Sequence, residues 1–269
     1  MTRLGGFARA CHPLPAMAVA AVVTAFGWSL GWRGWPLWWV LVVVLVGQLS
    51  VGWGNDAHDA GLDAHVGRFD KPTVEGVVSP RALWIAAVTA LAVSSTLSWV
   101  VAGLIGGSFH VLSLGMAWLY NLGLSRTVWS WIPYAVAFGA VPPFLSYGLS
   151  GEGPPMWSVA VFAIVGVSAH LANALPDVES DRAAGVDGLA VRLGTHRSSI
   201  VCWVLLGVGT VILVIATIGD RPLVSAGAAM TYVVEIIVGS RSRRRSAVFH
   251  ALLAVVAVDV VALVLAVGS

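Results

Sequence analysis

The sequence predicts an all-α protein, a polytopic membrane bundle of about nine transmembrane helices. Hydropathy, the length of the apolar runs and the placement of the cations support this prediction. The 269 residues are 58% hydrophobic and 10% charged, with a mean hydropathy of +0.88, which excludes an ordinary soluble domain. A backbone in lipid must satisfy its own hydrogen bonds, which leaves helices or a closed barrel. The apolar runs lack the strict alternation of barrel strands, so a helical bundle is expected.

A membrane-spanning helix needs about 20 mostly apolar residues, and nine runs approach this length. The run from Leu14 is expected to be a retained first helix and not a signal peptide. The whole chain, residues 1–269, is expected to form a single membrane domain. The predicted spans are Leu14–Leu30, Pro36–Val51, Ala82–Leu104, Phe109–Gly123, Trp129–Leu149, Met156–Leu175, Ser199–Ile218, Leu223–Gly239 and Ala247–Val267.

The cations predict the orientation of this bundle. With these spans, all of the 15 Lys and Arg residues except Arg33 and Arg221 fall in segments on the side that holds the N-terminus. Short cytoplasmic loops are enriched in Lys and Arg. We therefore expect a multi-pass plasma-membrane protein with a cytoplasmic N-terminus.

Acidic residues cluster in the stretch from Asn55 to Lys71, directly after the second apolar run. This stretch holds four aspartates and two cations. Asn55, Asp59 and Asp63 are spaced at i, i+4 and i+8, which places them along one face of a helix. Carboxylates stacked in this way repel one another. A positive charge is therefore expected among them.

The same spacing recurs in Asn173, Asp177 and Asp181, after the sixth apolar run. An even number of predicted crossings separates the two motifs, so both open on the cytoplasmic face. One explanation is a pair of solvated loops. The repeated Asn/Asp/Asp register favours another, in which the motifs are two halves of one divalent-metal site in a cytoplasm-facing active site.

Carboxylate and amide oxygens are hard ligands, suited to Mg2+. Mg2+ is usually held by a few carboxylates together with substrate phosphates. Arg68, Lys71 and Arg126 lie beside the motifs and could balance phosphate charge, although each alone could simply follow the positive-inside rule. A diphosphate site in a membrane bundle favours a substrate with a lipid tail. Cleavage of an allylic diphosphate gives a carbocation, which requires a dry cavity.

These residues resemble the signatures of a known family. Asn55-Asp56-x2-Asp59-x3-Asp63 resembles the first aspartate signature of the UbiA-type intramembrane prenyltransferases, and Asp177-x3-Asp181-x3-Gly185 resembles the second. Tyr120-Asn-Leu-Gly-Leu-Ser-Arg126 falls where that family has a tyrosine followed by basic residues. Ser125 stands where a lysine is common, so Arg126 alone is expected to supply that phosphate contact.

The resemblance implies Mg2+-dependent transfer of a prenyl group from a prenyl diphosphate to an aromatic or lipophilic acceptor. It implies that Tyr120 faces the developing cation or the diphosphate, and that Asp63 also deprotonates or orients the acceptor. The metal ligands implied are Asp56, Asp59, Asp63, Asp177 and Asp181, and the diphosphate-binding residues are Asn55, Arg68, Lys71, Arg126 and Asn173.

Two alternatives stay open from the sequence. A UbiA-type terpene cyclase would use the same ionisation without an acceptor, and a secondary transporter could use the acids as an ion path. Nothing in the sequence indicates nucleic-acid binding. The acceptor, the prenyl chain length, the oligomeric state and the roles of His170, Glu235 and Asp259 are not fixed by the sequence. His12 is a candidate for the cavity entrance.

Overall fold

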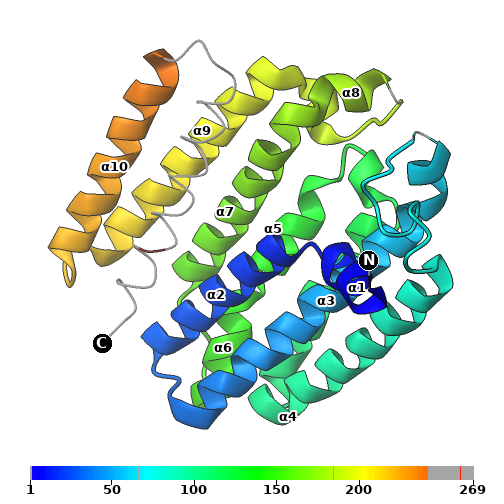
Figure 1. Ribbon diagram of the computed structural model, residues 1–269. Coiled ribbons are helices and arrows are strands. Elements are labelled where there is room, and N and C mark those ends of the chain that lie inside the picture. The colour runs from blue at the N-terminus through cyan, green and yellow to red at the C-terminus, as the bar shows by residue number, and fades with distance from the viewer. Residues whose placement is uncertain (1, 66, 184, 242–260, 262–269) are drawn as a thin grey trace.

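The computed structural model describes the chain except residues 1, 66, 184, 242–260 and 262–269 (Figure 1). All regular structure in the described part is helical, which confirms the all-α prediction. The elements are α1 (Arg3–Ala10), α2 (Pro13–Leu30), α3 (Gly34–His65), α4 (Pro80–Asn121), η1 (Leu124–Arg126), α5 (Trp131–Gly139), α6 (Val141–Ser150), α7 (Met156–Ala174), η2 (Leu175–Asp177), α8 (Val178–Ala183), α9 (Leu189–Thr217) and α10 (Pro222–Arg241).

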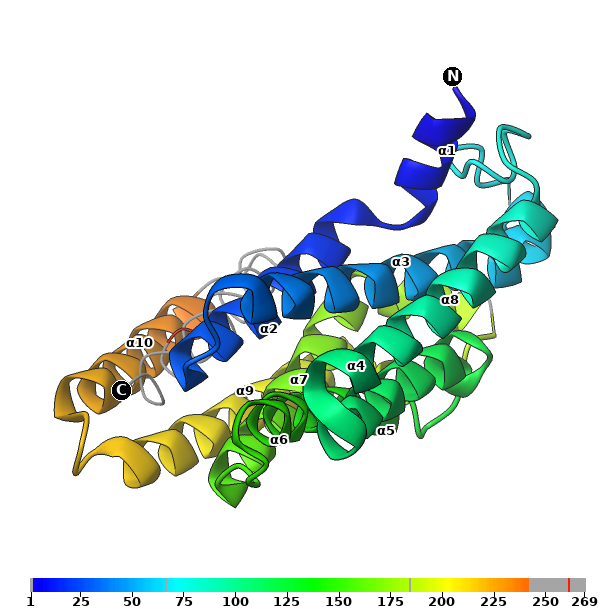
Figure 2. The same cartoon turned by 90° about the horizontal axis from the view of Figure 1, so that it is seen from below.

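Six helical stretches among the described residues are long and apolar enough to cross a membrane. They are α2, α3, α4, α5 with α6, α7 with η2, and α9. Figure 2 shows the long helices running roughly along one direction, with α1 projecting to one side of the bundle near the C-terminal half of α3. The second predicted span stops at Val51, whereas α3 continues as one helix to His65. The first acidic motif is therefore helical and not a loop.

Helix α4 folds back on itself at Gly103, where φ is 66° and ψ is 179°. Ser98 Oγ lies 2.7 Å from His110 Nδ1 across this bend. Residues 12 apart in a straight helix would be about 18 Å apart along the axis, so the two halves must lie side by side. Two predicted spans, Ala82–Leu104 and Phe109–Gly123, match these halves.

The count of nine spans stays a prediction. The fifth predicted span is found as two helices, α5 and α6, joined at Ala140 before Pro142 and Pro143. The ninth, Ala247–Val267, lies outside the described residues apart from residue 261.

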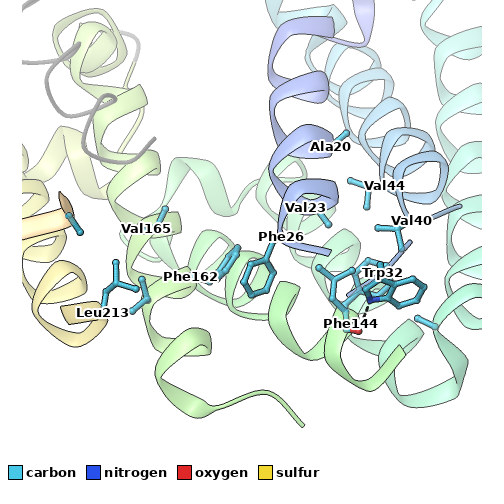
Figure 3. Packing of buried hydrophobic residues seen from close by; sticks show 14 residues of the cluster. Ala20, Val23, Phe26, Trp32, Val40, Val44, Phe144, Phe162, Val165 and Leu213 are labelled. Atoms are coloured by element: carbon cyan, nitrogen blue, oxygen red, sulfur yellow. Dashed lines mark hydrogen bonds between the residues drawn. The ribbon is translucent and has the colours of Figure 1, made fainter. Parts of the chain in front are cut away.

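Apolar packing closes one end of the bundle (Figure 3). Phe26 of α2 and Phe162 of α7 have ring centroids 4.7 Å apart. Trp32 donates from Nε1 to the Leu145 carbonyl at 3.0 Å. Trp32 lies two residues before α3, and the acidic motif lies near the other end of that helix. The apolar core therefore leaves the acidic end for polar residues.

Small residues allow the close helix contacts that membrane helices use in place of a hydrophobic driving force. A Cβ added at Gly107 would lie 2.7 Å from the backbone of Ser98, across the α4 bend. The two halves of α4 can therefore pack only with glycine at this position.

We expect Gly107→Ala to lower the thermal unfolding midpoint in detergent, because overpacking against backbone costs about 1–3 kcal/mol. Gly115→Ala is the matched control on the same helix, since nothing lies within 4 Å of its added Cβ. It should be neutral or slightly stabilising. Equal midpoints for the two variants would contradict the packing of the α4 bend.

Candidate active site

The polar residues predicted from the sequence gather at one end of the bundle. The loop after α3 and the helix α8 lie at the same end in Figure 1. The C-terminal ends of α3, α4 and α7 and the N-terminal end of α9 lead into the connections at this end. The arrangement follows from the antiparallel chain path, which returns each motif-bearing helix to the same side.

The first motif extends along the last turns of α3. Because the helix is continuous to His65, Asn55, Asp59 and Asp63 share one face, as predicted. Asp63 is 4% exposed, whereas Asn55 and Asp59 are half-buried. Carboxylates at this spacing destabilise a helix unless cations compensate them.

Two arginines supply that compensation. Arg68 Nη1 lies 3.7 Å from Asp63 Oδ1, and Arg126 Nη2 lies 3.3 Å from Asp59 Oδ1. Both arginine side chains are about half exposed, at 53% and 49%. They are therefore accessible to an anion arriving from solvent.

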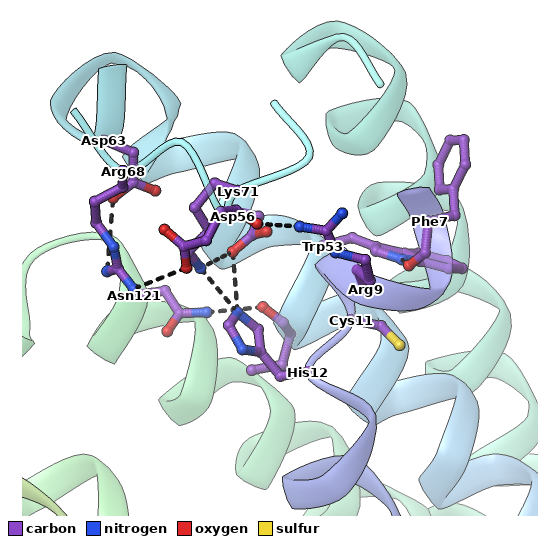
Figure 4. A network of polar contacts seen from close by, with 12 residues as sticks. Phe7, Arg9, Cys11, His12, Trp53, Asp56, Asp63, Arg68, Lys71 and Asn121 are labelled. Carbon is purple, nitrogen blue, oxygen red and sulfur yellow. Dashed lines mark hydrogen bonds and ion pairs between the residues drawn. The ribbon is translucent and has the colours of Figure 1, made fainter. Parts of the chain in front are cut away.

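Lys71 and Asp56 form a buried ion pair beside this face (Figure 4). Lys71 Nζ lies 2.6 Å from Asp56 Oδ1, and the two side chains are 9% and 1% exposed. His12 Nε2 lies 2.9 Å from the same oxygen. The sequence predicts that Lys71 contacts diphosphate and that Asp56 binds metal. In the structure these two side chains bind each other.

The second motif does not follow a single helix face, which corrects the assumption of a repeated register. Asn173 is in the last turn of α7, Asp177 ends the 3-10 turn η2, and Asp181 lies in α8. Pro176 causes the break because it lacks the N–H that an α-helix would use there. Asn173 and Asp177 are exposed. Burial and, after it, the Asp177 carboxylate raise the pKa of Asp181.

The connection from α4 to α5 joins the two motifs. Arg126 binds Asp59 of the first motif. Ser130 Oγ lies 3.0 Å from Nε2 of His170, a residue of α7 one turn before Asn173. The same hydroxyl oxygen accepts a hydrogen bond from the Leu189 N–H at the start of α9. One short connection thus contacts α3, α7 and α9.

Three rings line this connection. Tyr120 packs edge-on against Tyr134 at 5.1 Å and against His170 at 5.7 Å. Tyr134 and His170 have centroids 4.7 Å apart. The next residue, Asn121, donates from Nδ2 to the Val51 carbonyl of α3 at 3.0 Å. Tyr120 therefore lies at the junction of the two motifs.

The donor set is chemically suited to Mg2+. Asp63 Oδ2 is buried without a hydrogen-bond partner, and both motifs offer hard oxygen ligands. No three His, Cys, Asp or Glu side chains among the described residues are grouped closely enough to hold a metal ion unaided. The five-carboxylate ligand set stays a prediction.

Sequence reasoning missed the roles of Ser130 and Tyr134 and gave His12 only a place at the cavity entrance. No local pattern marks Ser130 or Tyr134, since each contact joins segments far apart in the sequence. Glu235 and Asp259, whose roles the sequence leaves open, lie outside the described side chains.

A family model described as the UbiA prenyltransferase family matches residues 14–256. The chain belongs to the UbiA prenyltransferase family. The predicted family is thereby confirmed, and the prediction of a prenyltransferase is confirmed at the level of the family. The relatives that this chain matches include proteins named as prenyltransferases.

Curated relatives differ in their named substrates. Digeranylgeranylglyceryl phosphate synthase of Methanoregula boonei is 28% identical over 78% of this chain and 84% of its own length. The 1,4-dihydroxy-2-naphthoate octaprenyltransferase of Mycobacterium tuberculosis is 27% identical over 74% of each chain. Protoheme IX farnesyltransferase of Chloroflexus aurantiacus is 28% identical over 49% of this chain, and the match spans only 24% of that protein.

Solved structures share the fold. A UbiA homolog from Archaeoglobus fulgidus bound to GPP and Mg2+ superposes with a TM-score of 0.77 at 15% identity, covering 98% of this chain and 100% of the other. A digeranylgeranylglyceryl phosphate synthase structure gives 0.74 at 14% identity, with 99% of each chain covered. UbiA-family helical architecture is thus established for this chain.

We expect Lys71→Met to destabilise the protein by about 3 kcal/mol, because it leaves the buried Asp56 carboxylate without its cation. The measurement is the thermal unfolding midpoint in detergent. Arg192→Ala is the comparison, since its pair with Asp187 is exposed, with side chains 53% and 58% accessible, and exposed pairs contribute little. Similar midpoints for the two variants would show that Lys71 and Asp56 do not form this pair.

Proposed function

We propose that this protein transfers a prenyl group from a prenyl diphosphate to a lipophilic or aromatic acceptor, in a Mg2+-dependent reaction at the cytoplasmic face of the plasma membrane. The observation that supports the proposal best is the placement of Arg126. It binds Asp59 of the first motif, and its connection contacts α7, the helix that carries Asn173 of the second motif. An anion at Arg126 would therefore lie between two sets of oxygen ligands.

The metal would be held by Asp59 and Asp63 on α3 and by Asp177 and Asp181 on the other side. When bound, Mg2+ neutralises diphosphate charge and so makes diphosphate a better leaving group. Asn55 and Asn173 carry side-chain amides at the start of each motif that can donate to phosphate oxygens. Several ligands on separate helices favour a bridging anion over a free metal ion.

The cations of this chain bind the leaving group. Arg68 and Arg126 are both about half exposed and each is paired with a motif aspartate. A guanidinium can donate two parallel hydrogen bonds to phosphate oxygens. As the allylic C–O bond breaks, its electron pair leaves with the diphosphate, and these arginines stabilise the charge that develops there.

The remaining prenyl cation needs protection from water and a nucleophile. The ring of Tyr120, at the junction of the motifs, offers a π face to the cation. Apolar side chains of the bundle exclude water. An acceptor carbon or oxygen then forms the new bond and loses its proton, which Asp63 would accept.

The orientation rests on the cations. Arg68, Lys71, Arg126 and Arg182 lie at the site end of the bundle, whereas Arg33 lies in the α2–α3 connection at the other end. This asymmetry supports a cytoplasmic site.

We expect Asp59→Ala and Asp177→Ala each to lower Mg2+-dependent release of diphosphate from geranyl or farnesyl diphosphate by roughly a hundredfold or more. Purified protein in detergent, assayed with a panel of lipophilic and aromatic acceptors, provides the measurement. Glu152→Gln is the control, since Glu152 lies in the α6–α7 connection, away from the motif-bearing ends of α3 and α7.

Release at the parent rate by both alanine variants would refute the enzymatic proposal. A prenylated acceptor supports transfer. A hydrocarbon product formed without any acceptor would show instead that the protein is a cyclase.

A further inference from the structure

The N-terminal segment, residues 3–12, contacts the site, although the proposed mechanism does not use it. His12 has φ 51° and ψ 67°, the only positive φ among non-glycine residues that the structure describes. This left-handed conformation is unfavourable for a residue with a side chain and persists only where surrounding contacts hold it. Here the contact is with Asp56, whose Oδ1 lies 2.9 Å from His12 Nε2.

Gly52 makes this contact possible. A Cβ at Gly52 would lie 2.5 Å from the Cys11 carbonyl oxygen and 2.8 Å from its Cα. Gly52 and Asp56 are one turn apart on α3 and share a face. The connection between α1 and α2 therefore packs directly on the backbone of α3 at Gly52, where no side chain intervenes. From there His12 reaches the Asp56 carboxylate, one turn further along α3.

Helix α1 also docks on α3 before the joint. Trp53 donates from Nε1 to the Phe7 carbonyl at 2.9 Å, and the rings of these two residues meet edge-on at 5.7 Å. Segment 3–12 is thus fixed against α3 at two points before it begins α2.

The same segment holds the loop that follows α3. Arg9 donates to the Asp70 carbonyl and forms an ion pair with Glu75 at 3.0 Å. His12 Nε2 lies 3.4 Å from Lys71 Nζ, which is itself 2.6 Å from Asp56. Arg68, on the same loop, reaches Asp63. Figure 4 shows Arg9 and His12 on one side of Asp56 and Arg68 on the other.

We propose that residues 3–12 act as a clamp that fixes the loop 67–76 over the first acidic motif. His12 is a positioning residue that acts through Asp56 and Lys71, and Arg9 holds the far side of the loop. Asp56 then serves as the anchor of the loop and not as a metal ligand. By fixing this loop, the clamp also places Arg68 where it can bind diphosphate; this consequence rests on the proposed function.

The clamp is tested first without substrate. Hydrogen–deuterium exchange of residues 67–76 should be faster in His12→Ala and in Arg9→Ala than in the parent. Arg3→Ala is the matched control, because Arg3 is an exposed cation on the same helix. His12→Gln should keep near-parental exchange, since its amide nitrogen can take the position of the imidazole Nε2 and donate to Asp56. His12→Gly should behave like His12→Ala, because it relieves the backbone but removes the contact.

The second arm measures binding of inorganic diphosphate with Mg2+ by calorimetry in detergent. Losing the positioning of one charged contact should weaken binding roughly tenfold in His12→Ala and Arg9→Ala. His12→Gln and Arg3→Ala should stay within about twofold of the parent.

Unchanged exchange at 67–76 in both His12→Ala and Arg9→Ala would overturn the clamp. Faster exchange with unaltered diphosphate binding would limit the segment to a structural role and overturn the positioning of Arg68. A parent protein that binds no diphosphate would refute the proposed function, while the exchange result would still decide whether the clamp exists.

Discussion

Charge repulsion along the last turns of α3 is the constraint on which the site depends. Three polar positions on one helix face, two of them carboxylates, are unfavourable in isolation, and more so near lipid. The structure balances them with cations from two separate connections, Arg68 after α3 and Arg126 after α4. In these ion pairs a phosphate could replace the carboxylate beside each arginine, and a divalent cation could replace the arginine beside each carboxylate.

Helix geometry explains why these groups meet. The α4 bend at Gly103 brings the chain back to the acidic end, so the connection after Tyr120 lies beside α3. That connection then contacts α7 through Ser130 and His170. Close packing at glycines and aromatic packing around Phe26 hold the opposite end of the bundle.

Much of this was predictable from the sequence. Long charge-free runs gave the helices, and even the α4 bend matched two separate apolar runs. The Asn55/Asp59/Asp63 spacing gave the first half of the site. Pro176 indicates a break in the helix that carries the second motif, although the repeated spacing alone predicts a continuous helix face. The contact between His12 and Asp56 could not be predicted, because it joins residues 44 apart through a backbone conformation that no local pattern indicates.

The central claim is that both acidic motifs face one divalent ion and its diphosphate. Fe2+ in place of Mg2+, with ascorbate and inorganic diphosphate, cleaves a backbone near the bound metal and so reports its position directly. The account predicts two cleavage sites, one near residues 55–63 and one near residues 173–181, both suppressed by excess Mg2+. Cleavage confined to only one of these stretches would contradict it.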